Sequence, residues 1–423
     1  MTVRLNTHQR VLFLCSLGGL LEFYDFIISA LLASYIASIF FPTETEINGL
    51  LAAFATFAVG YLARPLGGII FGHFGDVYGR KRTFTFSILM MALATFCIGL
   101  IPNYTTLGIT APILLIFFKI IQGISIGGEI PGAITYISEF FPKKKGLATG
   151  VVFCFLISGI SMGYLVQASL ISLYTDEQIT AWAWRLPFFL GGIFGIIAFY
   201  LRKKLIEIPQ FIPYLDPNQP FPILEVLNKQ WRVFILTTII TGLGAIVIVS
   251  LFTFLPAYLT KILHYTLNDM IWMSASAVFI AALSCILFGW LSDKVRRINL
   301  LLLLIVAVFI LATPIFYIYT EHFLLYPLSL ALSALLVGLS WGNIPAILSE
   351  SFPSNIRYSG IGLSYNVGFG IVGGLTPLIL ISSIKWSEST MAPAYVLMLA
   401  SVLSLLTLVC FKKNLSMFSD KGV

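Results

Sequence analysis

The chain has 423 residues, of which 58% are hydrophobic and 10% are charged, and its mean hydropathy is +0.96. Soluble domains carry about 25% charged residues, so this composition excludes a water-soluble globular protein. The net charge of +7 does not call for a nucleic-acid partner, because basic residues beside membrane helices face anionic lipid headgroups.

Apolar runs along the chain are each long enough for a helix of about 20 residues, which crosses a hydrocarbon core about 30 Å thick. The sequence therefore predicts an all-α membrane protein with twelve transmembrane helices. In chain order, the predicted helices are residues 11–40, 48–72, 82–101, 107–139, 146–173, 186–204, 232–262, 270–291, 298–319, 323–350, 357–384 and 391–412.

Basic residues predict the orientation of these helices. If the N-terminus is cytoplasmic, nearly all lysines and arginines, Arg202 among them, fall inside, and only Arg185, Lys261 and Lys385 fall outside. This asymmetry places both termini in the cytoplasm of a bacterial-type inner membrane. The first helix is too long for the apolar segment of a signal peptide and lacks a small-residue cleavage site.

One polar stretch interrupts the apolar pattern near the middle of the chain. Its prolines, at positions 209, 213, 217, 220 and 222, break any helix across it. We therefore expect an N-terminal six-helix bundle at residues 1–204, a cytoplasmic linker at 205–231 and a C-terminal six-helix bundle at 232–423. A short amphipathic helix is expected within the linker, at 223–228.

Residues that serve redox and metal chemistry are sparse. The five cysteines lie singly in apolar helices, and the four histidines lie at helix ends or in loops, so we expect no disulfide, metal site or cofactor. No G-x-x-x-x-G-K-[ST] loop for ATP is present either. The energy for any transport is therefore expected to come from an ion gradient.

Two pairs of motifs suggest that the chain is an internal duplication. GHFGDVYGRKR at 72–82 resembles GWLSDKVRR at 289–297, and SEFFP at 138–142 resembles SESFP at 349–353. Duplicated sets of membrane helices are typical of transporters, in which two similar bundles rock about a shared central site. The duplication predicts two pseudo-symmetric halves.

The first of these motifs, Gly72-x-x-x-Asp76-x-x-Gly79-Arg80-Lys81, is similar to the loop signature of the major facilitator superfamily. Further segments resemble its metabolite:proton symporter family: Leu21 to Phe26, Arg64 to Gly68, Gln122-Gly123, Gly127 to Glu129, Trp182 to Pro187, Ile208 to Phe211, Arg357 to Gly360 and Ser364 to Asn366. Carriers of proline/betaine, α-ketoglutarate, citrate, shikimate and dicarboxylates belong to that family. The resemblance implies the major facilitator fold and proton-coupled uptake of a small polar metabolite.

The chain departs from the family pattern in a few places. Lys119 stands where the fourth-helix signature usually has arginine, which keeps the charge but loses the two-pronged guanidinium. The second-half loop, 289–297, lacks the closing glycine. These departures leave the identity of the substrate open.

Glu22 and Asp25 lie three residues apart on one face of the first predicted helix, deep in an apolar run. An isolated charge there costs roughly 2.5–3.5 kcal/mol. Burial and mutual repulsion both favour the neutral form, so one of them is a candidate proton carrier. The alternative is a structural pair with a basic residue such as Arg64 or Lys119.

Lys119, Gln122 and Glu129 share one side of the fourth predicted helix. Lys119 with Glu22, Asp25 or Glu129 is therefore a candidate central ion-pair network in which proton and substrate compete. A static salt bridge between helices is the rival interpretation. Static pairing predicts misfolding on mutation, whereas coupling predicts a folded, uncoupled carrier.

Asn366, with Phe369, Gly370 and Gly373, forms a polar and glycine-rich stripe on the eleventh predicted helix. We expect the glycines to pack against neighbouring helices and Asn366 to face the substrate. Weaker substrate candidates of the same kind are Tyr24, Gln167, Trp341, Asn343 and Tyr365.

A group of glycines and charged residues at the predicted cytoplasmic ends forms a candidate gate. Asp76 can lie at the positive end of a neighbouring helix and pair with Arg80. The resemblance implies that this group latches the cytoplasmic side when the cavity opens outward. Its members are Gly72, Asp76, Gly79, Arg80, Glu139, Asp293, Arg297, Glu350 and Arg357.

The sequence thus predicts a secondary transporter, not an enzyme, that imports a small polar metabolite, an organic acid or a zwitterion, by alternating access. Its partners are the substrate, protons and membrane lipids, without nucleic acid, and it is expected to be a monomer. Sodium could replace the proton. One alternative is an exporter of the same fold, and another is a membrane-embedded enzyme or sensor, although no nucleophile and base pair or metal cluster supports the latter.

Overall fold

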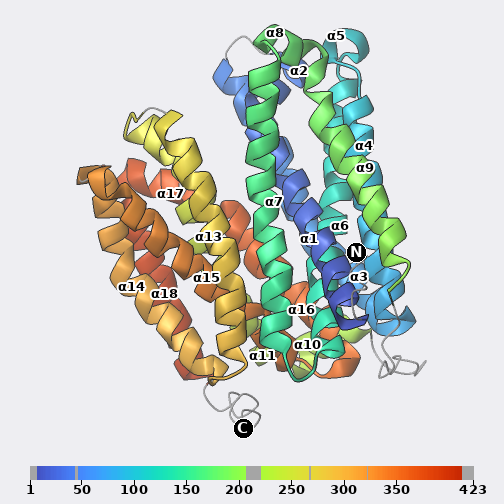
Figure 1. Ribbon diagram of the computed structural model, residues 1–423, viewed down its shortest axis with the longest axis vertical. Helices are drawn as coiled ribbons and strands as arrows, with labels where there is room; N and C mark the ends of the chain where they lie inside the picture. Colours follow the sequence, from blue (N-terminus) through green and yellow to red (C-terminus); the bar gives the residue numbers. More distant parts are fainter. Residues whose placement is uncertain (1–6, 43–45, 206–220, 266–267, 322, 412–423) are drawn as a thin grey trace, which may run out of the picture.

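The structure is a computed structural model that describes residues 7–42, 46–205, 221–265, 268–321 and 323–411. The described residues form helices and connecting turns without a strand (Figure 1). Eleven of the helices are long and apolar enough to cross a membrane. Helix α3, with 33 residues, is long enough to be the remaining predicted span. The predicted fold class, an all-α membrane protein, is therefore confirmed.

The first half of the chain folds into six long helices and several short ones. Each long helix corresponds to one predicted span. The helices are α1 (Thr7–Leu31), α2 (Ala33–Phe40), α3 (Glu46–Tyr78), α4 (Arg80–Leu100), α5 (Tyr104–Leu107), α6 (Thr110–Phe140), α7 (Lys145–Leu173), α8 (Asp176–Gln178), the π-helical η1 (Ile179–Ala183) and α9 (Arg185–Arg202).

The second half repeats this plan with more interruptions. Short π-helical and 3-10 segments break or join several of its helices. The elements are α10 (Pro222–Lys229), α11 (Trp231–Ile248), η2 (Val249–Thr253), α12 (Leu255–Ala257), η3 (Tyr258–Ile262), α13 (Asn268–Ser292), α14 (Arg297–Glu321), η4 (Phe323–Leu325), α15 (Tyr326–Ser351), η5 (Ser354–Ile356), α16 (Arg357–Tyr365), η6 (Asn366–Gly373), α17 (Gly374–Ser387) and α18 (Ala392–Cys410).

Three local features differ from the sequence-based expectation. The first predicted helix divides at Leu32 into α1 and α2. The motif at 72–82, expected as a loop, is helical up to Tyr78, and the chain turns at Gly79, whose φ of 113° favours glycine. The eleventh predicted helix contains the π-helical η6, a kind of segment found frequently at functional sites.

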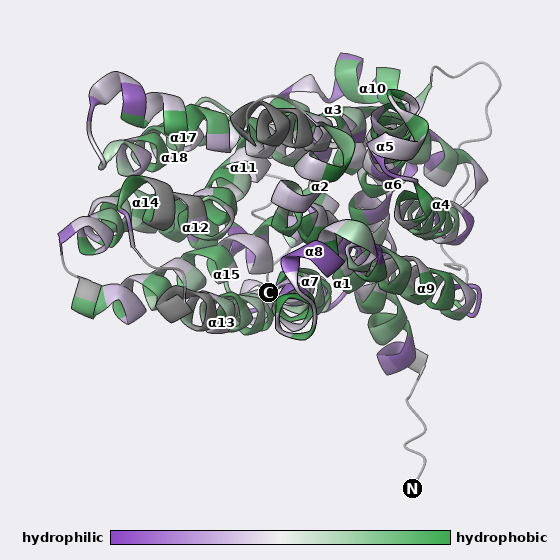
Figure 2. Cartoon of the chain, turned by 90° about the horizontal axis from the view of Figure 1, so that it is seen from above, coloured by the Kyte–Doolittle hydropathy of each residue, from purple (hydrophilic) through white to green (hydrophobic). Residues whose placement is uncertain are grey.

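Figure 1 shows α1 to α9 on one side and α13, α14, α15, α17 and α18 on the other. Figure 2, turned by 90°, shows that hydrophobic residues predominate along the helices. Many large apolar side chains point outward, for example Leu173 with 73% and Leu378 with 61% of the side chain exposed. Lipid tails can contact such an apolar surface without cost, which agrees with a membrane location.

The halves pack against each other through α3 with α16 and through α7 with α13. We call one end of the molecule the basic end. It consists of the C-termini of α3 and α13, the N-termini of α4, α7, α14 and α16, and helix α10. Helix α10 covers the short helix predicted at 223–228, and it contacts α3, η5 and α16 there. Most of the predicted linker, residues 206–220, lies outside the described residues.

Candidate functional site

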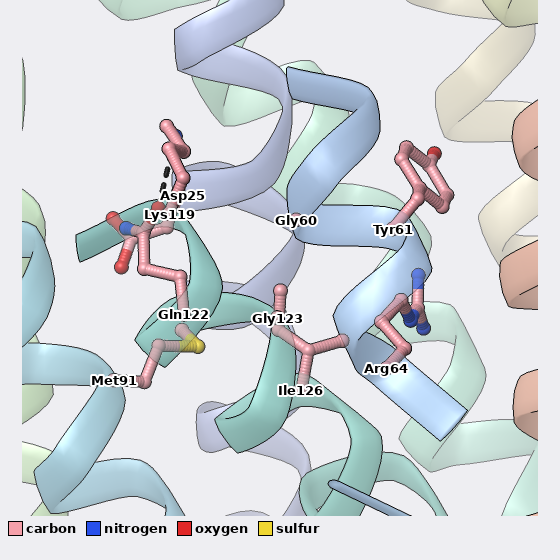
Figure 3. A pocket seen from close by; sticks show the side chains of 9 residues that line it. All are labelled: Asp25, Gly60, Tyr61, Arg64, Met91, Lys119, Gln122, Gly123 and Ile126. Atoms are coloured by element: carbon pink, nitrogen blue, oxygen red, sulfur yellow. Dashed lines mark hydrogen bonds between the residues drawn. The ribbon is translucent and has the colours of Figure 1, made fainter. Parts of the chain in front are cut away.

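A small cavity of about 20 Å³ lies inside the first half (Figure 3). Helices α1, α3, α4 and α6 supply its walls. Figure 3 shows Asp25, Lys119 and Gln122 on one side, with Tyr61 and Arg64 on the other. The lining residues are Asp25, Gly60, Tyr61, Arg64, Met91, Lys119, Gln122, Gly123 and Ile126.

A chain of hydrogen bonds connects the charges on the first side. Lys119 Nζ donates to Gln122 Oε1 (2.9 Å), Gln122 Nε2 donates to Thr95 Oγ1 (2.7 Å), and Thr95 Oγ1 donates to Asp25 Oδ2 (2.7 Å). The second carboxylate oxygen of Asp25, Oδ1, has no hydrogen-bond partner among the described residues. The cation and the carboxylate are thus linked through two neutral side chains. Asp25 Oδ1 packs against α9, since a Cβ on Gly191 would clash with it.

The predicted ion pair of Lys119 with a carboxylate is not found among the described residues. Lys119 Nζ instead donates to Ser29 Oγ as well as to Gln122. Ser29 holds the ammonium group one turn beyond Asp25 on α1, which keeps the two charges apart. The structure brings Lys119, Gln122 and Asp25 together as expected, but through a relay instead of a direct contact.

Arg64 lies on the opposite wall of the cavity, and few groups around it stabilise the charge of its guanidinium. Its guanidinium lies 5.5 Å from the ring centre of Tyr61 and 5.1 Å from that of Phe369, which belongs to the second half. Nε and Nη2 have no hydrogen-bond partner in the described part of the chain, although the side chain is 2% exposed. A buried guanidinium with two unused donors is suited to bind a carboxylate.

Glu22 does not line the cavity. Its side chain is 1% exposed, and neither carboxylate oxygen has a hydrogen-bond partner among the residues that the structure describes. Glu22 lies one helical turn from Asp25, on the side of α1 that leads to the basic end. The structure therefore separates the two carboxylates predicted to act as a pair: Asp25 has a donor, and Glu22 has none.

Glu129 is also away from the cavity, in a buried ion pair. Its Oε1 lies 2.5 Å from Arg202 Nη2, and its Oε2 accepts a hydrogen bond of 2.7 Å from Ser87. Arg202 also donates to the carbonyl oxygens of Phe84 and Cys15 and covers the Phe84 ring at 3.7 Å. The sequence places Arg202 on the cytoplasmic side, where its charge was expected to face lipid headgroups, but its side chain is fully buried in the protein.

Two other predicted substrate residues hold helices together instead of lining the cavity. The Tyr24 hydroxyl donates to the Pro187 carbonyl (2.9 Å), which joins α1 to α9. Asn366 Nδ2 donates to the carbonyls of Gly127 and Gly362, both at 2.7 Å. Asn366 thus connects α6 of the first half with the second half.

The weaker substrate candidates also join helices instead of lining the cavity. Gln167 donates to the Leu31 carbonyl (2.9 Å), and Asn343 donates to the Arg297 carbonyl (3.1 Å). Trp341 and Tyr365 belong to an aromatic cluster between the halves. The ring centres in this cluster are 5.3 to 6.3 Å apart, and its members are Phe23, Phe153, Trp341, Tyr365 and Phe369.

Asp76 lies where the halves meet at the basic end. It pairs with the Arg80 guanidinium and accepts hydrogen bonds from the backbone N–H groups of Tyr358 (3.2 Å) and Ser359 (2.9 Å) at the start of α16. A helix N-terminus leaves such groups unsatisfied and attracts negative charge. Gly72 allows this approach, because a Cβ there would lie 2.8 Å from Ser359 Cα.

Further contacts complete this first charge cluster. Arg80 also donates to the Ser354 carbonyl (2.6 Å), and Glu139 pairs with Arg80 (3.4 Å) and with Arg357 (2.7 Å). Asp76, Arg80 and Glu139 belong to the first half, whereas Ser354 and Arg357 belong to the second. The cluster therefore holds the halves together at the basic end.

The second motif repeats the arrangement with the halves exchanged. Asp293 accepts hydrogen bonds from the backbone N–H groups of Gly146 (2.7 Å) and Leu147 (2.8 Å) at the start of α7. Arg297 lies 3.1 Å from Asp293 and 3.0 Å from Glu350, and Lys145 lies 3.5 Å from Glu350. In this second charge cluster, a carboxylate of the second half caps a helix of the first.

Several residues of the site were missed by reading the sequence. Ser29, Thr95 and Ser87 are hydroxyl residues inside apolar helices, where such side chains frequently bond only to their own backbone. Arg202 ends an apolar run, so the sequence did not distinguish it from a residue in the lipid headgroup region. An unpaired Glu129 in an apolar helix was the available signal that a buried cation had to be nearby.

Comparison with known proteins agrees with this geometry. The family model of the Major Facilitator Superfamily matches residues 14–377. The proline/betaine transporter of Escherichia coli K12 is 34% identical over 424 residues, covering 94% of this chain and 82% of that protein. The glycine betaine/proline/ectoine/pipecolic acid transporter OusA of Dickeya dadantii is 33% identical, with the same coverage.

Solved structures show the same fold at low sequence identity. The proton:xylose symporter XylE of E. coli superimposes with a TM-score of 0.77 at 15% identity, covering 96% of this chain and 95% of that one. The human organic anion transporter MFSD10 has a TM-score of 0.66 at 14% identity, covering 96% and 100%.

The curated relatives are transporters of small polar solutes, which bears out the predicted transporter class. They also exclude the membrane-embedded enzyme. The family match covers most of the chain, and the helices follow the predicted spans. The chain therefore belongs to the major facilitator superfamily and is a multi-pass membrane transporter, not an enzyme.

Proposed function

We propose that the chain imports a small zwitterion of the proline and betaine class together with protons. The observation that carries this proposal is the pattern of charges around the cavity. Arg64 presents unused donors on one wall, and the buried carboxylate of Asp25 lies on the other. A site with both signs suits a solute that carries a carboxylate and an ammonium group, and the relatives transport such solutes.

The substrate carboxylate would bind the Arg64 guanidinium, and the ammonium group would face the Asp25 side of the cavity. Charge-assisted hydrogen bonds of this kind are stronger than neutral ones, which supports recognition in a buried cavity. The Tyr61 ring, which also lines the cavity, can attract a quaternary ammonium group through its negative face. A dicarboxylate would place its second negative charge beside Asp25, which disfavours organic acids.

Alternating access would move residues 1–204 against residues 232–423. The two charge clusters hold the basic end closed, and the positive-inside pattern places that end in the cytoplasm. This conformer would therefore be the outward-facing one in the inner membrane, with the clusters acting as latches that open for release. Helices α1, α3, α4 and α6 of the first half supply all the lining residues, so a monomer would hold a site driven by protons without a cofactor.

Uptake by reconstituted protein tests the proposal. Proteoliposomes would receive labelled proline, glycine betaine, citrate or α-ketoglutarate, each with and without an inward proton gradient, next to protein-free liposomes. Accumulation of proline or glycine betaine only under the gradient would support it. Accumulation of citrate or α-ketoglutarate instead, or a sodium gradient serving in place of protons, would overturn it.

A further inference from the structure

Helix α10 exposes large apolar residues at the basic end. Leu224 and Leu227 are 43% and 42% exposed, and Phe221, immediately before the helix, is 62% exposed. Their spacing of three residues puts them on one side of the helix, and we call them the apolar row. Val226, on another side of α10, is fully buried in the protein. Exposed apolar residues that are grouped in this way commonly mark a surface that another molecule covers.

A third side of α10 is polar. Lys229 lies 3.4 Å from Glu225, one turn earlier, and Asn228 is exposed beside them. Just beyond the helix, the Arg232 guanidinium lies 5.2 Å from the ring centre of the exposed Trp231. Tryptophan beside basic residues is typical of the lipid headgroup region. A helix with an apolar side next to a polar side that carries basic residues is typical of helices that lie on a membrane surface.

The apolar row continues a stripe of exposed apolar residues on α3. The stripe recurs every four positions along one side of that helix, which is the side that faces lipid. Phe221 joins the row to it, because its ring centre lies 5.2 Å from that of His73, which lies 5.8 Å from that of Phe74. Figure 2 shows α10 at the rim of the molecule, beside α3. The stripe consists of Leu62, Leu66, Ile70, Phe74 and Tyr78.

The depth of α10 agrees with a position at the membrane surface. His73, which Phe221 contacts, lies five residues before Tyr78, the last residue of α3. This separation is about 7 Å along the helix axis. Tyr78 is exposed at the basic end, where a tyrosine commonly lies at the level of the headgroups. The apolar side of a helix on a membrane enters the boundary between headgroups and acyl chains by about 5–10 Å, so the acyl chains reach the start of α10.

We infer that α10 lies on the cytoplasmic leaflet of the membrane, with Phe221, Leu224 and Leu227 among the outermost carbons of the acyl chains. Lys229 and Arg232 then lie beside the lipid phosphates, whose negative charge they match. The partner is the lipid surface, because the apolar row is continuous with the lipid-facing side of α3. A free phosphate would leave the row in water. This contact does not depend on which substrate the protein carries.

The accessibility of a nitroxide label tests the position of α10. Leu224→Cys and Leu227→Cys, in a background whose five native cysteines are replaced by alanine, would each carry the label in proteoliposomes of phosphatidylglycerol and phosphatidylcholine. Oxygen concentrates in the acyl region, so it should relax both labels more strongly than a water-soluble nickel complex does. Leu66→Cys, exposed on α3, is the lipid reference, and Glu177→Cys, exposed on α8, is the water reference.

The ratio of oxygen to nickel accessibility at both positions of the apolar row should be closer to that of the lipid reference. A ratio equal to that of the water reference would overturn the inference, because the row would then lie in the aqueous phase. Low accessibility to both reagents would also overturn it. In that case another segment of this chain or a second copy of the protein covers the row.

Quenching of tryptophan fluorescence tests the contact with lipid phosphates. Lipids with brominated chains quench nearby tryptophans, and the difference between the wild type and Trp231→Phe isolates the signal of Trp231. At equal content, brominated phosphatidylglycerol should quench Trp231 more strongly than brominated phosphatidylcholine. Each basic residue near the surface should enrich the anionic lipid about fivefold.

The double variant Lys229→Gln with Arg232→Gln removes both proposed contacts, so the two lipids should quench Trp231 equally. Lys385→Gln, which removes an exposed basic residue from the last turn of α17, is the matched control and should keep the preference. Equal quenching by the two lipids in the wild type would contradict the contact of these basic residues with lipid phosphates. A preference that persists in the double variant would contradict it as well.

Discussion

The buried pair of Glu129 and Arg202 allows a quantitative test of whether Glu129 is structural or takes part in coupling. Glu129→Gln removes the charge that Arg202 faces at 2.5 Å while keeping the shape of the side chain. Breaking one partner of a buried ion pair typically costs about 3–5 kcal/mol. Arg202 retains two carbonyl partners and the Phe84 ring, so we expect the lower value, about 3 kcal/mol.

The free energy of unfolding, measured by denaturant titration in detergent, checks this value. The double variant Glu129→Gln with Arg202→Met removes both charges, so it should be more stable than the single variant by at least about 1 kcal/mol, since contacting residues are coupled. Glu177→Gln, exposed on α8, should remain within about 0.5 kcal/mol of the wild type.

A different result would refute the structural assignment. If Glu129→Gln unfolds at nearly the wild-type free energy but no longer accumulates substrate under a proton gradient, the pair is not a static bridge. Glu129 would then be a coupling residue, as the sequence allowed. Because folding and transport are measured on the same preparation, the two interpretations cannot be confused.

Three further changes test the gate and the cavity. Asp76→Asn weakens the cap on α16 and the pair with Arg80, so the outward-facing population should fall about tenfold, measured by distances between spin labels across the basic end. Gly72→Ala should produce the same shift, because its Cβ would lie 2.8 Å from Ser359 Cα; an unchanged distance distribution in either variant contradicts the latch. Arg64→Lys should raise the KM for proline at least about tenfold with little change in kcat, since the single ammonium of lysine cannot make two parallel hydrogen bonds to a carboxylate as a guanidinium does. An unchanged KM would place the substrate carboxylate elsewhere.

The membrane spans could be predicted from sequence because their signal is local. A run of apolar residues has few alternatives in a bilayer, and each predicted long helix has a counterpart. The continuation of α3 to Tyr78 was not predicted, because its polar residues are typical of a loop. Contacts of Asp76 with the second half keep this turn helical, and a sequence does not show such distant partners.

The sequence predicted which charged residues belong to the candidate site, but it did not predict which residues they contact. The buried charges Glu22, Asp25 and Lys119 stand out because charge in an apolar run is costly. Their partners are ordinary residues, such as Thr95, whose hydroxyl also lies 3.0 Å from the Met91 carbonyl of its own helix, and sequence offers no reason to select them. Which cation meets which carboxylate depends on how helices are rotated, and only the fold determines that.

The two halves contribute unequally to the chemistry even though they resemble each other in sequence. The cavity lining and the hydrogen-bond relay come from the first half, while the second half approaches Arg64 through Phe369. At the basic end, by contrast, the charge clusters are reciprocal, with Asp76 capping α16 and Asp293 capping α7. The reciprocal charge clusters therefore join the two halves, whereas the charged residues of the cavity all belong to the first half. Because Phe369 and Gly370 of the second half pack against Arg64, binding at Arg64 is expected to depend on the position of the halves.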